Sequence, residues 1–272
     1  MSQHKYSVAL IDRVGMLLLV AVTAFSLLLL VAPSLIVIAV SFEPRAYISF
    51  PPSGFSLRWY SWVMNNRQLT DSVLVSLRIS VVVAAICVAI GLPAAFASVR
   101  GSFPGKPALN AFLLAPQMIP GMVIGIASLF FGAYFAFRAS DAMLILSLSV
   151  FCLPFVIRIT MARLAGLDPR LDEASANLGA GGLETFFRVT LPQLAPALLA
   201  ASAFTFIEAF DNVTVALFTS NVRARPLPVE LYYLVQFDSS PAIAAISALE
   251  IGLSFLVMLL IAKTVGLDRL GR

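Results

Sequence analysis

Among the ionisable residues inside long apolar stretches of this sequence, four stand out as its strongest candidates for chemistry: Arg78, Glu208, Asp211 and Glu250. A charged side chain at the centre of a membrane helix costs about 2.5 to 3.5 kcal/mol on insertion scales, so each one needs a partner or a function. Glu208 and Asp211 are three residues apart and therefore share one face of a helix. Counted from the ends of the apolar stretches at about 1.5 Å per residue, all four fall in the outer half of a membrane.

These four residues permit two interpretations. In the first, Arg78 pairs with one of the acids as an internal tie. In the second, ionised acids outnumber the single base and leave a negative charge that favours the entry of a cation, although burial can instead keep a carboxyl protonated and neutral. We predict that Glu208, Asp211, Glu250 and Arg78 belong to a substrate path.

The motifs of common enzymes are missing from the sequence. The only histidine, His4, lies close to the first residue, which removes the commonest general base and zinc ligand. Cys87 and Cys152 lie within apolar stretches, where a thiol is usually a packing residue. The segment GSFPGKP, residues 101–107, is the nearest approach to a phosphate-binding loop, but its glycines are too close and Lys106 is followed by proline. We therefore expect no catalytic residue, metal site, disulfide or cofactor on this chain.

Composition places the chain in the lipid bilayer. Of 272 residues, 60% are hydrophobic and only 12% are charged, and the mean hydropathy is +0.96, values far outside the usual globular balance. About 20 apolar helical residues cross the hydrocarbon. Six such stretches occur, at about 14–40, 72–97, 108–137, 142–161, 195–218 and 243–265. Because a backbone in lipid must satisfy its own hydrogen bonds, we predict an all-α polytopic membrane protein with one domain, 1–272.

Two prolines and two glycines mark the third stretch. Pro116 and Pro120 are expected to kink it. Gly121 and Gly125 form the small-xxx-small pattern of close helix packing, and we interpret them as packing residues only. Just ahead of the second stretch, Trp59, Tyr60 and Trp62 are expected to anchor an amphipathic segment at the membrane interface.

Basic residues in the short loops predict the orientation. The first stretch is longer than the core of a cleaved signal peptide, which runs to roughly 15 residues, so we expect an uncleaved anchor. One side collects most of the basic residues: Lys5, Arg13, Arg100, Lys106, Arg163, Arg170, Arg188, Lys263, Arg269 and Arg272. The other side has Arg45, Arg58, Arg67, Arg138, Arg223 and Arg225, in longer loops. Both termini are therefore expected in the cytoplasm, and the net charge of +4 reflects this bias rather than nucleic-acid binding.

A polar interval between the fourth and fifth stretches has its own helix signals. Asp168 is a suitable N-cap, Pro169 suits the first helical position, and Gly179 is placed to stop the helix. Leu171, Ala174, Ser175 and Leu178 recur at helical spacing along one face, with Glu173 on another. A second short helix is expected after Gly182, ending at Pro192. A helix of about ten residues is unstable alone in water, so the first one must dock onto this chain or onto a partner.

The same interval resembles the EAA motif of binding-protein-dependent ABC importer permeases. Glu173-Ala174-Ser175 is followed by Gly179 after three residues, and by Val189-x-Leu191-Pro192 after nine more, as in that motif. Ser175 and Val189 depart from the motif's alanine and isoleucine. The segments 54–66 and 226–249 resemble permeases of the spermidine/putrescine type. The chain is identified on these motifs as a member of the permease family, with a MetI-like fold.

The resemblance implies function, partners and site residues. The loop 162–192 would contain a coupling helix that seats in a groove of an ATPase subunit. Its coupling residues would be Leu171, Glu173, Ala174, Ser175, Leu178, Gly179, Leu191 and Pro192. The partners would be an ABC ATPase dimer, which binds ATP and Mg²⁺, a second homologous permease subunit, a periplasmic solute-binding protein and membrane lipid. The chain would lie in a bacterial inner membrane and pass a polyamine or a related cation.

Two alternatives are compatible with parts of the sequence. The same importer class also carries amino acids, opines, iron compounds and phosphonates. An ion-coupled secondary transporter would use Glu208, Asp211 and Glu250 as ion sites, but such folds usually contain repeated halves. We find no internal repeat here, and such a transporter has no use for the docking loop.

Overall fold

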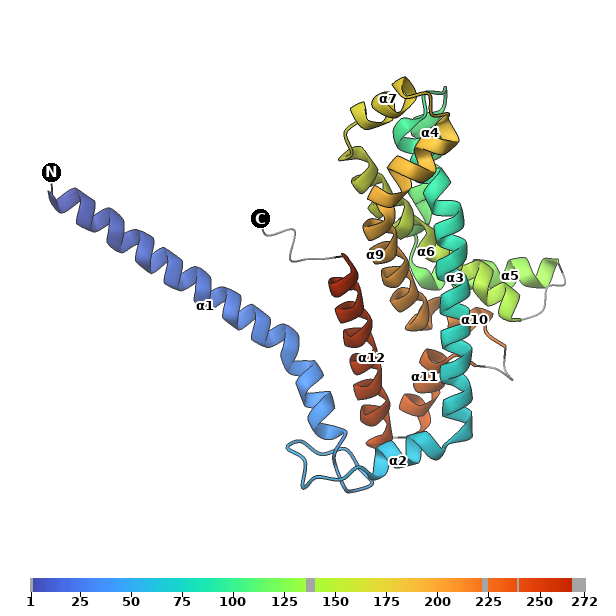
Figure 1. Ribbon diagram of the computed structural model, residues 1–272. Helices are drawn as coiled ribbons and strands as arrows, with labels where there is room; N and C mark the ends of the chain where they lie inside the picture. The colour runs from blue at the N-terminus through green and yellow to red at the C-terminus, as the bar shows by residue number, and fades with distance from the viewer. Residues whose placement is uncertain (1, 136–139, 222–224, 239, 266–272) are drawn as a thin grey trace. The chain divides into compact units, whose positions relative to one another are not determined.

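The computed structural model describes residues 2–135, 140–221, 225–238 and 240–265, and these residues are predominantly helical (Figure 1). No β-strand occurs within those ranges, and the all-α prediction is confirmed. The basic residues Arg138, Arg223, Arg269 and Arg272 lie outside the described residues, as do the side chains of His4, Lys5 and Arg13. The elements are α1 (Ser2–Val40), α2 (Arg58–Asn65), α3 (Arg67–Arg100), α4 (Lys106–Leu114), the 3₁₀ helix η1 (Ala115–Met118), α5 (Gly121–Tyr134), α6 (Asp141–Ala165), α7 (Arg170–Asn177), α8 (Gly182–Thr185), the π-helical turn η2 (Phe186–Thr190), α9 (Leu191–Phe210), α10 (Val213–Thr219), α11 (Leu227–Phe237) and α12 (Ala242–Val265).

Most of the predicted membrane spans are present. In the described part of the chain, five helical segments are long and apolar enough to cross a bilayer: Gly15–Val40, Arg67–Arg100, Asp141–Ala165, Gly182–Phe210 and Ala242–Leu260. A sixth candidate is the pair formed by Lys106–Met118 and Gly121–Tyr134, which is bent by 101°. This part of the chain therefore has five candidate spans, or six if the bent pair counts as one.

The prediction of one kinked span over 108–137 is wrong in its geometry. Helix α4 ends at Leu114, and the 3₁₀ turn η1 carries Pro116. Ile119, just before Pro120, is extended, because a proline ring excludes the helical conformation from the preceding residue. The two prolines break the segment into two helices rather than bending one, and residues 136 and 137 lie outside the described residues.

The fifth span also differs from the predicted range of 195–218. Helix α9 ends at Phe210, and α10 begins separately at Val213. Asn212 is extended between them, and its side-chain oxygen accepts a 2.9 Å hydrogen bond from the Val215 amide. A helix N-cap at Asn212 thus starts a new helix in the middle of an apolar run.

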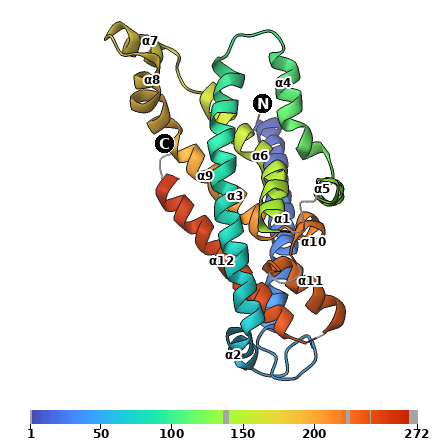
Figure 2. The ribbon, with the colours of Figure 1, turned by 90° about the vertical axis from the view of Figure 1, so that its right-hand side faces the viewer.

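The described residues fall into two compact units, each of which has its own packing. The first combines the chain up to Val63 with the α12 residues up to Gly252, and the second combines residues 64–238 with the chain from Leu253 onward. In the second unit, α3, α6 and α9 pack against one another, as Figure 1 and Figure 2 show. In both views α7 lies at one end of this bundle and α11 lies toward the other. The bundle core includes Ile79, Val83, Cys87, Leu144, Leu148, Cys152, Val156, Ala201 and Val215.

Glycines permit two close helix contacts in the second unit. A Cβ at Gly125 would lie 2.9 Å from a Phe218 ring carbon and 3.0 Å from the Thr214 carbonyl oxygen, so α5 approaches α10 at this point. A Cβ at Gly91 would lie 2.8 Å from a methyl group of Val156, where α3 approaches α6. The interpretation of Gly121 and Gly125 as packing residues is confirmed.

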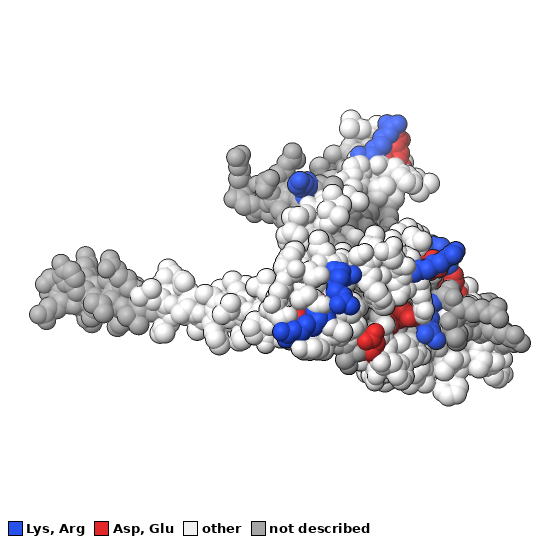
Figure 3. Space-filling view, turned by 90° about the horizontal axis from the view of Figure 1, so that it is seen from below, with Lys and Arg blue, Asp and Glu red and all other residues white. Residues whose placement is uncertain are grey.

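The first unit contains α1 and a loop organised around one carboxylate. The α1 residues from Met16 to Leu30 are exposed, and Figure 3 shows no charged side chain on the described stretch of this helix. In the loop, Glu43 is fully buried and accepts hydrogen bonds from the Ser49 hydroxyl and from the Ser53 hydroxyl and amide. These bonds, led by the one from Ser49, lower the pKa of the Glu43 carboxyl from 4.5 to about 2.

Trp59 is part of this loop structure rather than an interfacial anchor. Its ring is buried, and its indole nitrogen donates a 2.9 Å hydrogen bond to the Glu43 carbonyl oxygen. Tyr60 shares a 2.6 Å hydrogen bond with Ser41. The prediction was wrong for Trp59, because a partner 16 residues earlier in the chain satisfies its only donor.

We predict that Gly125→Ala destabilises the protein and that Gly252→Ala does not. The added methyl at Gly125 meets backbone atoms of α10 that have no room to move, and overpacking of this kind costs about 1 to 3 kcal/mol. At Gly252 nothing lies within 4 Å of the added Cβ, so only the better helix propensity of alanine remains. Thermal denaturation of the two variants in detergent micelles measures the difference, and equal midpoints would contradict the close approach of α5 and α10.

The Glu43 network predicts a pH dependence in the acid range. Because the folded pKa lies below the ordinary value, the stabilisation is complete above about pH 4.5 and is lost as the pH falls toward 2. The sequence has two tryptophans, so Trp62→Phe leaves Trp59 as the only indole reporter. We expect its emission to shift to the red as the pH falls toward 2, and Glu43→Gln to be shifted already at neutral pH. Identical emission of parent and Glu43→Gln at pH 7 would contradict this assignment.

Candidate functional site

The polar interval forms the short helix α7, and its first turn is capped as the sequence predicts. The Asp168 carboxylate accepts a 3.0 Å hydrogen bond from the Arg170 amide, and the Asp168 carbonyl accepts one from Leu171. Asp172 and Glu173 lie in the first turn, where the positive end of the helix dipole stabilises acidic side chains. The predicted helix start is confirmed within one residue.

Gly179 ends α7 in a left-handed conformation, with φ of +87°. The Gly179 amide donates to the Ala176 carbonyl at 2.9 Å, and the Ala180 amide donates to the Ser175 carbonyl at 3.1 Å. This pair of bonds is the Schellman motif, which satisfies the last free carbonyls of a helix. The predicted stop at Gly179 is confirmed, and its cause is the positive φ rather than crowding, because a Cβ there would meet nothing within 4 Å.

Polar ties connect α7 to the bundle. The Asp172 carboxylate lies 3.4 Å from the Arg100 guanidinium at the end of α3, and it accepts a 3.2 Å hydrogen bond from the Thr190 hydroxyl. The hydroxyls of Ser175 and Thr185 are 2.9 Å apart. Ser175 therefore turns toward the bundle, although its spacing placed it on the same face as Leu171 and Leu178.

A cavity of about 240 Å³ lies beneath α7, lined by Phe96, Asp172, Ala176, Ala180, Gly182, Thr185, Phe186 and Thr190. Close packing of side chains is what usually makes a helix contact rigid. Because the space beneath α7 is open, the polar contacts of Asp172 with α3 and η2 and of Ser175 with α8 carry most of its attachment.

The outer face of α7 is exposed. Leu178 is 90% exposed, and Leu171, Glu173 and Ala174 are also exposed. Two further apolar side chains lie exposed just after α7, Leu183 at 77% and Phe187 at 61%, and the sequence analysis did not single them out. Their spacing of four residues within a helical run was the available signal. We use the name α7 face for the exposed apolar side chains of α7 and of the two turns after it, Leu171, Leu178, Leu183 and Phe187.

Pro192 does not end a second short helix, so that expectation is wrong. Helical structure continues from Gly182 through the π turn η2 into α9, and Pro192 lies in the first turn of α9. A π turn contains one more residue than an α-helical turn. Here it lies just before Pro192, which has no amide hydrogen to donate to the helix. Leu191 is partly buried, whereas Pro192 is exposed.

The predicted substrate-path residues do not gather in one place. Arg78 pairs with Asp141 at the start of α6 instead of with Glu208, Asp211 or Glu250, so the expected tie is wrong. Asp141 was not singled out because it lies outside the predicted span. Glu208 is half-buried in the last turn of α9 and Asp211 is exposed at its C-cap. No salt bridge of the described residues involves either acid. Glu250 is half-buried on α12, in the other compact unit.

Two further ionisable groups were missed by the sequence analysis. Arg158 lies on α6 and donates a 2.8 Å hydrogen bond to the Gln117 side chain in η1. Glu230 lies on α11 and is buried, with a relative exposure of 7%. An arginine inside the predicted fourth span was a visible signal, whereas Glu230 lay in a presumed loop.

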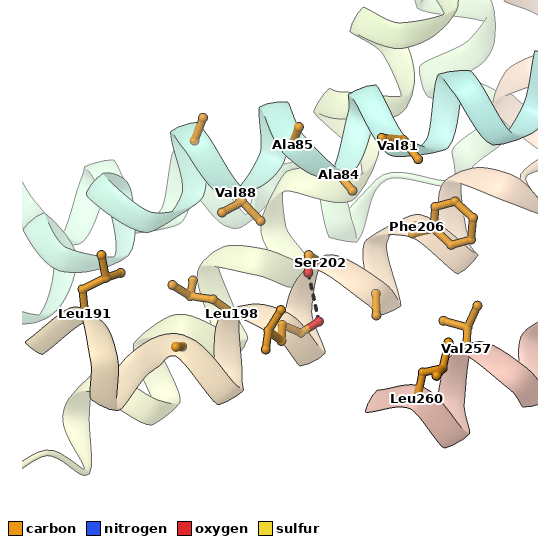
Figure 4. Close-up of a pocket in the computed structure, with 14 residues that line it drawn as sticks. Val81, Ala84, Ala85, Val88, Leu191, Leu198, Ser202, Phe206, Val257 and Leu260 are labelled. Carbon is orange, nitrogen blue, oxygen red and sulfur yellow. Dashed lines mark hydrogen bonds between the residues drawn. The ribbon is translucent and has the colours of Figure 1, made fainter. Parts of the chain in front are cut away.

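An apolar groove of about 950 Å³ lies between α3, α9 and α12 in the second unit (Figure 4). Val81, Ala84 and Val88 of α3 face Leu198 and Phe206 of α9 across it. The hydroxyl of Ser202 is satisfied by the Leu199 carbonyl at 2.9 Å. The groove offers no charge to a polar solute, and neither Glu208 nor Asp211 lines it.

Metal and thiol chemistry have no support in the described residues. Within the ranges that the structure covers, no three His, Cys, Asp or Glu side chains lie close enough to hold a metal ion. Cys87 and Cys152 are buried and unbridged.

Comparisons with known proteins agree with this architecture. Residues 87–265 match the model of the family described as "Binding-protein-dependent transport system inner membrane component". The chain is 31% identical to the spermidine/putrescine transport system permease protein PotC of Escherichia coli (strain K12). The matched region of 237 residues covers 87% of this chain and 89% of that protein. It is 30% identical to the putrescine transport system permease protein PotI of the same strain, over 82% of each chain.

A solved structure shares the fold at low sequence identity. It is the crystal structure of a bacterial ABC transporter involved in the import of the acidic polysaccharide alginate. The TM-score is 0.69 at 14% identity, over 93% of this chain and 96% of that one.

We predict that Gly179→Val loosens α7 and that Gly179→Asn leaves it nearly intact. A β-branched residue in the left-handed conformation costs about 1 to 2 kcal/mol, whereas asparagine adopts it more readily. Amide hydrogen exchange over residues 170–181 of the purified protein should be roughly 5- to 30-fold faster in the valine variant. Equal protection in both variants would contradict the glycine requirement, and unchanged exchange in α6 is the internal control.

Proposed function

The chain belongs to the family of binding-protein-dependent transport system inner membrane components, and from this membership we propose that it is the permease subunit of an ATP-driven importer that takes up a polyamine. It is a transport subunit of the inner membrane, not an enzyme. The observation that carries the coupling role is α7, a helix that is tied to the bundle by polar bonds and exposes apolar side chains on its outer face.

The α7 face suits docking onto a soluble partner. Exposed leucines on a capped helix fit an apolar groove in the mode of helix-in-groove recognition. Leu171, Glu173, Ala174, Leu178 and Gly179 are the contact and turn residues on this proposal. Ser175 positions the helix through Thr185 instead of touching the partner. Leu191 and Pro192 act at the start of α9, where motion of α7 enters the bundle.

Motion of α7 reaches two helices of the bundle at once. Asp172 contacts Arg100, the last residue of α3, and Thr190, the last residue before α9. A displacement of α7 therefore acts on both α3 and α9, which pack against each other and against α6. Rigid-body motion of packed helices between two states is a common form of switching.

Membership of the family supports a proposal for the partners. An ABC ATPase dimer binds α7 and supplies ATP and Mg²⁺, a second homologous permease completes the path, and a periplasmic binding protein delivers the solute. In this arrangement α7 faces the cytoplasm, together with both termini. Lys106 and Arg100 near the α3–α4 loop fall on the same side, in accord with the excess of basic residues in cytoplasmic loops.

A polyamine is the solute that the relatives support. Two of them, PotC and PotI, carry polyamines in their names and match most of the chain at about 30% identity. Glu208 and Asp211 share a helix face at the end of α9 and have no salt bridge among the described residues, so they can attract a cation. Glu250, on α12, stays a separate candidate for the path, and Arg78 is neutralised by Asp141 rather than by Glu208 or Asp211.

Uptake of radiolabelled putrescine and spermidine tests this function in cells that lack the gene. We expect the wild-type chain to restore uptake and Leu178→Asp to abolish it, because a charge at the most exposed leucine opposes docking in an apolar groove. Asn177→Asp, one residue away and also exposed, is the matched control and should retain uptake.

The outcomes separate the alternatives. Loss of uptake on ATP depletion, but not on collapse of the proton gradient alone, distinguishes the importer from a secondary transporter. Restored uptake of another solute, with no effect on either polyamine, would overturn the substrate and leave the permease. Normal uptake and normal ATPase co-purification with Leu178→Asp would overturn the docking role of α7.

A further inference from the structure

Helix α11 is fastened to α3 by two long-range hydrogen bonds. The Leu227 amide donates to the Ser76 hydroxyl at 2.8 Å, and the Gln68 side-chain amide donates to Glu230 Oε1 at 2.6 Å. Since α11 lies in the connection between α9 and α12, on the opposite end of the bundle from α7, it is remote from the proposed ATPase contact (Figure 1, Figure 2). The α7 proposal makes no use of it.

Glu230 is a buried carboxylate with one poorly satisfied oxygen. Its residue is only 7% exposed, and Oε2 has no hydrogen-bond partner among the described residues. The Arg225 guanidinium lies 3.7 Å from Oε2, which is ion-pair distance without a hydrogen bond. A buried charge normally requires both a partner and hydrogen bonds to offset its desolvation, so this pairing is incomplete.

The same guanidinium also lies over an aromatic ring. Its central carbon is 4.4 Å from the centre of the Tyr233 ring, one helical turn after Glu230 on α11. A carboxylate and an aromatic face together form the usual surroundings of a bound alkylammonium or guanidinium group. Arg225 thus occupies a cation cage built from Glu230 and Tyr233.

The cage opens toward the surface through further aromatic rings. The Tyr233 ring stacks on the Phe237 ring, with ring centres 6.2 Å apart. The Tyr232 ring packs edge-on against Tyr233, with ring centres 5.9 Å apart. Tyr232 and Phe237 are exposed, and the Arg225 side chain is 28% exposed. On the face that Figure 3 shows, basic and acidic side chains lie in small mixed groups rather than in one large patch of a single sign.

We propose that Glu230 and Tyr233 form a subsite for a primary ammonium group, which Arg225 fills in this structure and a solute amine fills when Arg225 withdraws. The exchange conserves charge, because one cation replaces another on the same carboxylate. An ammonium group has three donors in a compact head and can supply the hydrogen bond to Oε2 that Arg225 does not make. Arg225 is then an internal competitor for the subsite.

The proposal rests on the proposed function only for the identity of the solute, a polyamine. A simple alternative is that Arg225 and Glu230 are a structural tie between α11 and the segment before it. The two interpretations predict opposite effects of removing Arg225 on the binding of an external cation. Removing one partner of a tie weakens function whichever partner is removed, whereas removing an internal competitor strengthens binding of the external cation.

Equilibrium dialysis of radiolabelled putrescine against the purified transporter in lipid nanodiscs tests the difference. We expect Arg225→Gln to bind roughly tenfold more tightly than wild type, and Glu230→Gln to bind roughly tenfold more weakly. Arg225→Lys keeps a competing cation, whose ammonium group suits the subsite, and should bind putrescine no more tightly than wild type. The double variant should resemble Glu230→Gln, because the carboxylate is needed whether or not the competitor is present.

Two further variants separate binding from folding. Asp71→Asn removes an exposed acid that lies one helical turn after Gln68 on α3, and it should not change putrescine binding. Tyr233→Leu removes the aromatic face but no charge and should weaken binding in the Arg225→Gln background. If Glu230→Gln fails to give a monodisperse complex, the Tyr233→Leu comparison decides in its place.

A parallel dialysis with radiolabelled butylamine separates the subsite from the transported solute. Weaker binding of both amines in Arg225→Gln, or no change, would overturn the proposal and leave a structural tie. If the wild-type chain neither imports nor binds putrescine while the variants change butylamine binding as expected, the polyamine assignment fails and the subsite stands. If neither amine responds to any variant, the subsite is excluded.

Discussion

Polar backbone groups at helix ends must find partners where water is scarce, and this constraint decides where the chain departs from continuous helix. Asn212 caps α10 through the Val215 amide, and Ser140 caps α6 through the Met143 amide. Ser76, in the first third of α3, accepts a hydrogen bond from the Leu227 amide at the start of α11. An unpaired amide in an apolar environment is costly, and at these three helix starts a side chain replaces the lost bond. The breaks are therefore specified positions in the molecule.

The same constraint explains why α7 can be both ordered and movable. Its ends are closed by Asp168 and by the Schellman bonds around Gly179, so the helix needs no neighbour to satisfy its backbone. Its attachment to the bundle passes through Asp172 and Ser175 and leaves a cavity beneath. The Arg100–Asp172 pair is partly exposed, and ion pairs open to water contribute only about 0 to 1 kcal/mol each. A partner that binds the α7 face can thus shift the helix at small energetic cost, while the hydrogen bonds keep its motion connected to α3 and α9.

Some charged side chains in the described part of the bundle have a partner that satisfies them and others do not, and the proposed path includes the latter. Arg78 and Arg158 have side-chain partners, Asp141 and Gln117, and are accounted for structurally. Glu208 and Asp211 have no salt bridge among the described residues, and Glu230 has an incomplete one with Arg225. The large groove between α3, α9 and α12 is lined almost wholly by apolar side chains, which suits a lipid chain or another membrane helix better than a cation. Cation recognition is therefore expected at the acids near the ends of α9 and α11.

Much of this molecule was readable from the sequence, because the signals are local. A run of apolar residues specifies a membrane helix through its own transfer free energy, and Asp168, Pro169 and Gly179 specify a short helix through neighbours within a few residues. Tertiary structure alone decided that Arg78 pairs with Asp141, 63 residues away, and that Trp59 is buried on the Glu43 loop. It also decided that Gln68 reaches Glu230 across 162 residues and that Ser175 faces inward. Such partners depend on which helices pack together and on how each helix is rotated, and the hydropathy of an almost uniformly apolar helix does not determine its rotation.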